Sequence, residues 1–258
     1  MKVIVFGNVP LATWVVEKLI NEDKIELLGV VCEFYDENAF SHHRLDFPST
    51  YHFCKKNNIR ILSMSEAAEL AKRYEVFGIS VRFNKIFKAD FLALFNPGIV
   101  NLHGGELPRY RGTNIANHAV LEGAKHGAGT IHFLDKGIDT GDIVIREFFE
   151  VDSEITAFEF FGEILFSLQL GFEKLLKIIK EDGTIPKITQ DSLIKKGEVA
   201  KTYRKANLVG LNKIESFDDL SSVAAKVKAF YFPGHEPAFF EFDGRRYFIH
   251  PEFTKCIQ

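Results

Sequence analysis

The chain is poor in several residue types that mark particular classes of protein. Its 258 residues include only three cysteines, no Cys-x-x-Cys pair and a single tryptophan. A small, odd number of separated thiols predicts neither a disulfide framework nor a zinc site, and it is typical of a reducing compartment. Neither sign of charge dominates, because 32 Lys and Arg stand against 35 Asp and Glu. A uniformly basic protein that coats nucleic acid is therefore disfavoured.

Long hydrophobic runs are also missing. The first apolar run, residues 3–6, is too short for the core of a signal peptide and leads into a Gly-Asn turn. No run reaches the roughly 18 apolar residues that a membrane helix requires. We therefore expect a soluble, cytoplasmic protein with no membrane partner. Apolar residues still make up 46% of the chain, which is enough for a sizeable buried core.

What the chain does have is an alternation of short apolar runs with amphipathic segments. A run at 3–6, a turn and a helical pattern at 10–20 form the strand–turn–helix opening of doubly wound α/β domains. The continuing pattern predicts a Rossmann-like, mainly parallel sheet with helices on both faces. Further strands are expected at 25–32, 59–62, 76–81, 99–102, 129–134 and 143–147, and further helices at 51–57, 65–73, 90–95, 113–122 and 154–180.

The composition changes after this first part. Between residues 171 and 213, ten Lys or Arg stand against five Asp or Glu, which suits either a solvated linker or contact with a phosphate-bearing substrate. A helix at 217–230 and a hairpin follow, because Asp243-Gly244 between two apolar runs is a strong hairpin signal. We therefore expect a main domain over 1–182, then a linker and a small C-terminal α+β subdomain over 183–258.

The predicted hairpin carries aromatic side chains on both faces. Phe239, Phe240 and Phe242 alternate sides on the first strand, as do Tyr247 and Phe248 on the second. A hairpin at the edge of a monomer usually leaves one face polar. We expect one face to pack on the chain and the other to meet a second copy, which gives a homodimer. Alternatively, the preceding linker folds back and covers that face.

The chemically informative stretch, residues 100–112, reads VNLHGGELPRYRG. Asn101 and His103 are two apart at the end of an apolar run, so in extended backbone they share one face while Leu102 points into the core. An amide N–H and a protonated imidazole can both donate to the oxyanion that forms when a carbonyl is attacked. A carboxylate could hold the imidazole charged or accept a proton from the attacking amine, and Asp139 lies on a glycine-flanked turn downstream.

Each of these three residues alone has an ordinary structural explanation. A single histidine at a strand end can be incidental, an asparagine can form a turn, and an aspartate can shape its own turn. Only the combination predicts a catalytic set of Asn101, His103 and Asp139.

The same segment resembles the catalytic core of the formyltransferase family that uses 10-formyltetrahydrofolate. The family pattern is Asn-x-His, a Leu-Pro-x-Tyr-x-Gly loop and an Asp-x-Gly turn; Asn101, His103, residues 107–112 and residues 139–141 occupy those places in order. The resemblance is strong over 76–150 and loose before it. It implies that the main domain is catalytic, that 10-formyltetrahydrofolate is the formyl-donor co-substrate, and that no metal takes part.

The resemblance also places the pterin of the folate. The ring would lie between segment 83–87 and turn 135–138. Backbone groups there can form hydrogen bonds with the polar edge of the ring, and apolar side chains can pack against its faces. Core packing is an equally ordinary role for the phenylalanines there. The implied folate contacts are Phe83, Lys85, Ile86, Phe87, Asp135, Lys136, Gly137 and Ile138.

Several acceptors are compatible with the resemblance. Sugar N-formyltransferases, which act on nucleotide-linked amino sugars, fit best in length and resemble the runs YRGTN at 110–114 and FPGHEPA at 232–238. Methionyl-tRNA formyltransferases carry a full-sized barrel domain, for which too few residues follow the long helix expected at 154–180. They also have a basic surface for tRNA, whereas this chain is slightly acidic overall. The basic stretch 195–205 keeps that alternative open. Glycinamide ribonucleotide enzymes usually begin with Gly-x-Gly-Ser-Asn, unlike the run at 7–11. A formyltetrahydrofolate hydrolase and a non-catalytic folate- or nucleotide-binding module are the remaining alternatives.

A nucleotide-linked amino sugar would bring a diphosphate, which needs cationic or backbone N–H partners. Glu106 stands where the family often has Leu, and it could contact substrate or face solvent. The product would enter lipopolysaccharide or other glycan synthesis. The expected acceptor contacts are Gly7, Asn8, Pro10, Glu106, Arg111, Gly112 and Asn114, with Lys205 a further candidate for the diphosphate.

Overall fold

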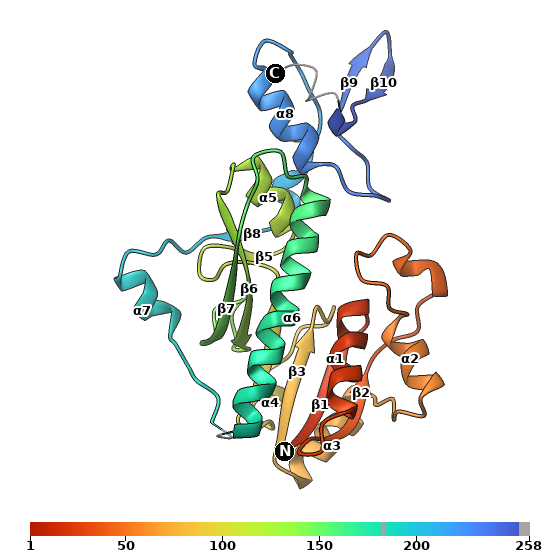
Figure 1. Ribbon diagram of the computed structural model, residues 1–258, viewed down its shortest axis with the longest axis vertical. Coiled ribbons are helices and arrows are strands. Elements are labelled where there is room, and N and C mark those ends of the chain that lie inside the picture. The colour runs from red at the N-terminus through yellow and green to blue at the C-terminus, as the bar shows by residue number, and fades with distance from the viewer. Residues whose placement is uncertain (182–183, 253–258) are drawn as a thin grey trace.

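The computed structural model describes residues 1–181 and 184–252, and the side chains of residues 37 and 38 are left aside. A six-stranded sheet lies at the centre of the molecule (Figure 1). Its strands are β1 (Lys2–Gly7), β2 (Glu26–Val31), β3 (Val76–Val81), β4 (Ile99–His103), β6 (His126–Phe133) and β7 (Ile143–Glu150). Their spatial order is β2-β1-β3-β4-β6-β7, with parallel pairs from β2 to β4 and antiparallel pairs from β4 to β7.

Different helices cover the two faces of this sheet. Alternation along β1 sends Val3 and Val5 to one face and Ile4 and Phe6 to the other. The first face packs against α1 (Pro10–Ile20), α5 (Ile115–Leu121) and the long α6 (Ala157–Glu181), and the second against α3 (Met64–Arg73) and α4 (Ala89–Leu92). The predicted Rossmann-like fold, mainly parallel with helices on both faces, is confirmed.

Local signals account for where several helices begin. Pro10 is the first residue of α1, where its missing N–H leaves no hydrogen bond unmade. The Ser63 hydroxyl accepts from the Glu66 N–H at the start of α3, and the Glu66 carboxylate accepts in return from the Ser63 N–H. The helix expected from residue 113 begins only at Ile115, because Asn114 has a left-handed backbone with φ of 58°.

The structure differs from expectation at short elements. The strand expected at 59–62 is reduced to one parallel bridge between Ile61 and Val30, because the chain turns at Ser63 into the cap of α3. Two unpredicted strands, β5 (Arg111–Gly112) and β8 (Thr202–Tyr203), pair in parallel. At two residues each, they are too short for a periodic pattern to signal them. The helix expected at 51–57 is α2 (Thr50–Lys56), which Ser49 caps.

The linker runs along the main domain. After α6 the chain forms α7 (Gln190–Lys195), β8 beside β5, and a 3-10 turn at Lys205–Leu208, well away from the hairpin (Figure 1). Residues 212–214 pair with the hairpin, where the Asn212 carbonyl accepts from the Phe239 N–H, and beyond the linker Phe217 packs edge-on against Phe240 at 5.3 Å. The alternative in which the linker covers the outer face of the hairpin is therefore wrong for the described residues.

A small C-terminal unit lies at one end of the molecule (Figure 1). It consists of α8 (Leu220–Ala229) and the hairpin of β9 (Phe239–Phe242) and β10 (Arg245–Phe248). Asp243 and Gly244 both have positive φ, 48° and 68°, as a two-residue type I′ turn requires, so the predicted Asp-Gly hairpin is confirmed. Among the described residues, no helix combines the length and the apolar character needed to span a bilayer.

Candidate active site

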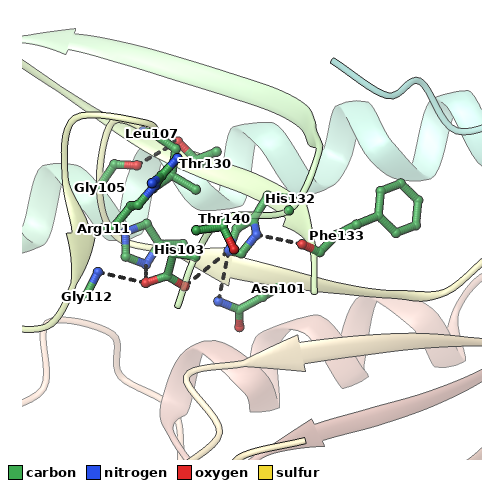
Figure 2. A network of polar contacts seen from close by, with 12 residues as sticks. Asn101, His103, Gly105, Leu107, Arg111, Gly112, Thr130, His132, Phe133 and Thr140 are labelled. Atoms are coloured by element: carbon green, nitrogen blue, oxygen red, sulfur yellow. Dashed lines mark hydrogen bonds and ion pairs between the residues drawn. The ribbon is translucent and has the colours of Figure 1, made fainter. Parts of the chain in front are cut away.

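The polar side chains of the site come from two neighbouring antiparallel strands. Asn101 and His103 lie at the carboxyl end of β4, and the register with β6 places His132 directly across from Asn101. His132 is fully buried and His103 is 6% exposed. The Asn101 Nδ2 lies 3.4 Å from the His132 Nε2 (Figure 2). The predicted pair on one face of β4 therefore faces a third polar group that sequence reasoning missed.

Asp139 reaches both histidines from the turn after β6. Its Oδ2 lies 3.5 Å from the His103 Nδ1, and its Oδ1 lies 3.4 Å from the His132 Nε2. The Gly112 N–H donates to the same Oδ2 at 2.8 Å (Figure 2). Asp139 itself has a left-handed backbone with φ of 52°, a conformation that non-glycine residues adopt chiefly where surrounding contacts hold them. The structure thus brings Asn101, His103 and Asp139 together.

The hydrogen bonds fix where protons sit on His103. Its Nε2 lies 2.6 Å from the Tyr110 carbonyl, which can only accept, so Nε2 donates and Nδ1 is left facing the Asp139 carboxylate. Burial lowers the pKa of His103, and the Asp139 charge opposes that effect. Burial would raise the pKa of Asp139, but the two histidines and the Gly112 N–H together hold it below its usual range. The pair can therefore take up one proton at Nδ1 with an ionised carboxylate ready to stabilise it.

A residue of the linker holds the catalytic turn. The side chain of Gln190 at the start of α7 is buried, and its Nε2 donates to the carbonyls of Asp139 and Gly141, both at 2.8 Å. Its Oε1 accepts from Arg111 Nε at 3.0 Å and Nη2 at 2.7 Å. No local sequence pattern predicts that Gln190 holds the turn of Asp139, because the two residues are 51 positions apart. Gln190 fixes the backbone of Asp139 relative to β5.

The loop that carries Tyr110 is anchored on one carboxylate. Glu122 accepts from the hydroxyls of Tyr110 at 3.2 Å and Tyr203 at 2.7 Å, and from Lys201 at 2.6 Å. Gly112 then passes so close to β8 that a Cβ there would lie 2.0 Å from the Tyr203 carbonyl oxygen. Only glycine fits this approach, which places the Gly112 N–H against Asp139.

A large cavity of about 1150 Å³ opens beside these groups. Asn101, His103 and Asp139 line one part of it, and apolar side chains of α6, such as Ile164 and Leu165, line another. Segments far away in the sequence complete the wall: residues 39–43, Arg82, Lys205 and the run 230–236. No group of three or more His, Cys, Asp or Glu side chains in the described part of the chain is arranged to hold a metal ion.

The residues predicted to contact folate lie in different surroundings. Phe83 and Ile138 line the cavity. Phe87 packs edge-on against Phe6 at 5.1 Å in the core of the second sheet face, and Phe83 contacts the same ring at 5.8 Å. Ile86 is 94% exposed. The remaining polar positions make local contacts: Lys85 pairs with Glu33, and Asp135 accepts from the Gly137 N–H and the Thr140 hydroxyl, while Lys136 is an exposed neighbour in that turn.

The residues predicted to contact the acceptor are also divided. Gly112 and Asn114 line the cavity, whereas Gly7 and Pro10 are buried at the β1–α1 junction and lie outside the lining. The Asn8 Oδ1 accepts from the Glu33 N–H, so this side chain holds β2. Arg111 is engaged by Gln190, and Glu106 turns away from the cavity toward His126, 3.1 Å from its Nε2.

The comparisons with known proteins agree with this geometry. Residues 1–164 match the model of the family described as formyl transferase. The methionyl-tRNA formyltransferase of Clostridium tetani is 30% identical over 203 residues, which cover 74% of this chain and 63% of that protein. The GDP-perosamine N-formyltransferase of Brucella melitensis is 28% identical over 199 residues, which cover 74% and 73%. The chain spans only 62–63% of the length of the first three methionyl-tRNA relatives.

Solved structures with the same fold match almost the whole chain. A 4-N formyltransferase from Francisella tularensis superposes with a TM-score of 0.77 at 18% identity, over 96% of each chain. An N-formyltransferase from Helicobacter canadensis, in complex with folinic acid and dTDP-3-aminofucose, gives 0.75 at 19% identity over 95% and 86%. At this identity the likeness is one of fold, while the sequence match to the family model covers well over half of the chain. The chain belongs to the formyl transferase family.

Proposed function

We propose that this protein transfers a formyl group from 10-formyltetrahydrofolate to the amino group of a nucleotide-linked amino sugar. The observation that carries the proposal is the geometry of Asn101, His103 and Asp139 at the wall of a cavity of about 1150 Å³. Sites for one small molecule usually measure about 300–1,000 Å³. A larger cavity suits the meeting of two small substrates.

The chemistry follows from the donors and acceptors at the cavity wall. The acceptor amine attacks the formyl carbon, a C–N bond forms, and the carbonyl oxygen becomes an oxyanion. The Asn101 amide donates to that oxyanion, and the His103 imidazole stabilises the same charge once it has taken up the proton of the amine. His103 Nδ1, supported by the Asp139 carboxylate at 3.5 Å, takes the proton that the amine loses. The bond to N10 of the folate then breaks, and the same proton passes to that nitrogen.

Two observations favour an amino sugar over tRNA as the acceptor. The 4-N formyltransferase from Francisella tularensis and the Helicobacter canadensis enzyme in complex with dTDP-3-aminofucose superpose with TM-scores of 0.77 and 0.75, against 0.61 for the methionyl-tRNA formyltransferase of Clostridium thermocellum. In addition, the cavity is closed on one side by the chain's own C-terminal run 230–236, which suits a small acceptor. The second candidate, methionyl-tRNA, is favoured by the several methionyl-tRNA formyltransferases that match at 26–32% identity.

A direct assay separates these acceptors. Purified protein is incubated with 10-formyltetrahydrofolate and, in parallel, with nucleotide-linked 3-amino and 4-amino sugars, with charged initiator tRNA, or with buffer. We expect tetrahydrofolate release and a mass gain of one formyl group only with an amino sugar, and none with the His103→Ala variant. Formylation of the charged methionine would replace the acceptor assignment, and release in buffer alone would indicate a hydrolase. Tight folate binding without turnover of any acceptor would favour a non-catalytic binding module.

The folate side of the cavity remains part of the same proposal. Phe83 and Ile138 offer apolar contact from the two segments expected to flank the pterin, and both line the cavity. Ile138 is 59% exposed and Ile86 is 94% exposed, so both present apolar surface that a bound ring would cover. We expect the donor to enter between these segments, with its N10 toward Asn101.

We also propose that the protein is a homodimer that acts in the cytoplasm on precursors of lipopolysaccharide or another glycan. Phe239 is buried on the C-terminal unit, whereas Phe242, Tyr247 and Phe248 are 68%, 42% and 56% exposed. Phe242 and Tyr247 lie on one face of the hairpin and Phe248 on the other, and the exposed pair Phe242 and Tyr247 forms an apolar surface of the kind found at protein interfaces. A second copy of the chain, contacting the same surface around a two-fold axis, would cover it.

A further inference from the structure

Arg82 is a cation at the cavity wall that has no acidic partner among the residues that the structure describes. It follows β3 directly and has a left-handed backbone with φ of 48°, which places a non-glycine residue in an uncommon conformation at the cavity wall. It makes no ion pair with the side chains that the structure describes, and its guanidinium lies 4.9 Å from the centre of the Phe161 ring. The side chain is accessible from the cavity, yet desolvation by the surrounding protein lowers its pKa.

His43 presents a single donor beside Arg82. Its Nδ1 accepts from the Leu45 N–H at 3.2 Å, so the proton of the neutral ring is on Nε2. This Nε2 is buried and has no hydrogen-bond partner among the described residues. Burial, helped by the charge of Arg82, lowers the pKa of His43 to about 4, so the ring is neutral near pH 7 and its tautomer is fixed. A buried N–H without a partner is costly unless a ligand supplies an acceptor.

The two groups are neighbours on one aromatic side chain. Phe161 of α6 packs edge-on against the His43 ring at 5.6 Å and beneath the Arg82 guanidinium. All three line the cavity that also contains the catalytic groups. The charge of Arg82 is felt at His103 as well, where it contributes to the lowered pKa.

We infer that Arg82 and the His43 Nε2–H form an anion subsite that holds a phosphate of the acceptor's nucleoside diphosphate. This inference rests on the proposed function. The Arg82 guanidinium and the His43 Nε2–H can only donate hydrogen bonds, and an ionised phosphate oxygen can only accept them. A diphosphate therefore supplies an acceptor to both groups near pH 7. In a nucleotide-linked amino sugar the phosphate is joined to the ring that carries the amine, which suits a subsite close to His103. The carboxylates of a folate are separated from its N10 by a benzoyl ring.

Isothermal titration of the full chain tests this subsite. The probes are UDP, dTDP, GDP and CDP, the corresponding nucleosides, and 5-formyltetrahydrofolate. The variants are Arg82→Gln, Arg82→Lys and His43→Phe. Arg60→Gln is the control, because it removes the same charge from an exposed pair with Glu66. Thermal melting checks that every variant is folded.

For the preferred diphosphate we expect a loss in affinity of about tenfold to a hundredfold in Arg82→Gln and about tenfold in His43→Phe. Arg82→Lys should fall between, because it keeps the charge and loses the planar fork. Nucleoside and 5-formyltetrahydrofolate affinities should stay within about twofold, and Arg60→Gln should match the wild type.

The outcomes separate the subsite from the proposed function. If the wild type binds none of the diphosphates, both the acceptor class and the subsite are overturned. If the wild type binds one and Arg82→Gln binds it equally well, the subsite alone is overturned. The same holds if Arg82→Gln loses 5-formyltetrahydrofolate instead, since the anion would then be a folate carboxylate. Equal losses of diphosphate and nucleoside would also overturn it, because the phosphate would not be what Arg82 holds.

Discussion

The catalytic centre and the C-terminal hairpin differ in how far their side chains find partners within the chain. At the centre, His103, His132 and Asp139 all have partners within the chain, and even the backbone of the catalytic turn is held by Gln190. On the hairpin, large aromatic side chains such as Phe242 are exposed. The first region is organised before any substrate arrives, as electrostatic catalysis requires. The second would be completed by the second copy of the chain that we propose.

The largest expected effect comes from the donors at the centre. His103→Ala or Asn101→Ala should lower kcat by about 10²–10⁴, because each change removes an oxyanion donor or the proton acceptor. Single-turnover rates with the amino sugar that the wild type formylates measure this loss. The sedimentation coefficient of each variant should match that of the wild type, which shows that the fold is retained. Wild-type turnover by either variant would remove that residue from the mechanism.

Asp139→Asn tests how the charge of Asp139 affects the pKa of His103 at the catalytic centre. The Asp139 carboxylate raises the pKa of His103 against the effect of burial, so its neutral replacement should lower that pKa further. The limb of the kcat profile that reports loss of the His103 proton should therefore move to lower pH, and the plateau above it should fall, because the imidazolium formed by proton transfer loses its counter-ion. A profile measured from about pH 5 to 9 that coincides with the wild type would restrict Asp139 to a structural role.

Gln190→Leu tests whether the linker organises the centre. The change leaves the carbonyls of Asp139 and Gly141 and the Arg111 guanidinium without their partner. We expect kcat to drop by roughly tenfold and the free energy of unfolding to fall by about 1–3 kcal/mol. Urea unfolding and steady-state kinetics measure the two effects. Lys195→Ala on the same helix is the control and should match the wild type in both; equal behaviour of the two variants would deny Gln190 its role.

The smallest effect on chemistry is expected at the hairpin. Phe242→Glu with Tyr247→Glu should convert a dimer to a monomer in sedimentation velocity, because two charges on the same face of the hairpin would be desolvated in an apolar contact. Both side chains are exposed, so the stability of the monomer should change by no more than about 0.5 kcal/mol. A wild type that stays monomeric at high concentration would end the dimer proposal.

Much of the fold is readable from the sequence because it depends on local patterns. The apolar run of β1, the helical pattern of α3 and the Asp243-Gly244 turn each act within a few residues, and all are found close to where they are expected. The spacing of Asn101 and His103 works in the same way, since residues two apart in a strand share a face.

What the sequence could not provide depends on which distant segments meet. His132 joins the site only through the antiparallel register of β6 on β4, and Gln190 only through the path of the linker. The one local signal for the former is a histidine, His132, between the apolar residues Ile131 and Phe133. Glu106 could not be placed either, because its pairing with His126 depends on where the loop lies against β6.

The contact between Gln190 and the catalytic turn has a consequence for how this protein can be divided. A fragment that ends at residue 181 would keep all six strands of the sheet and all three reacting side chains. It would lose the strand that passes Gly112 and the amide that fixes Asp139. A cut at the domain boundary expected from the sequence would therefore remove contacts that organise the site, and a hybrid enzyme that exchanges C-terminal halves would need to carry the linker along with the site.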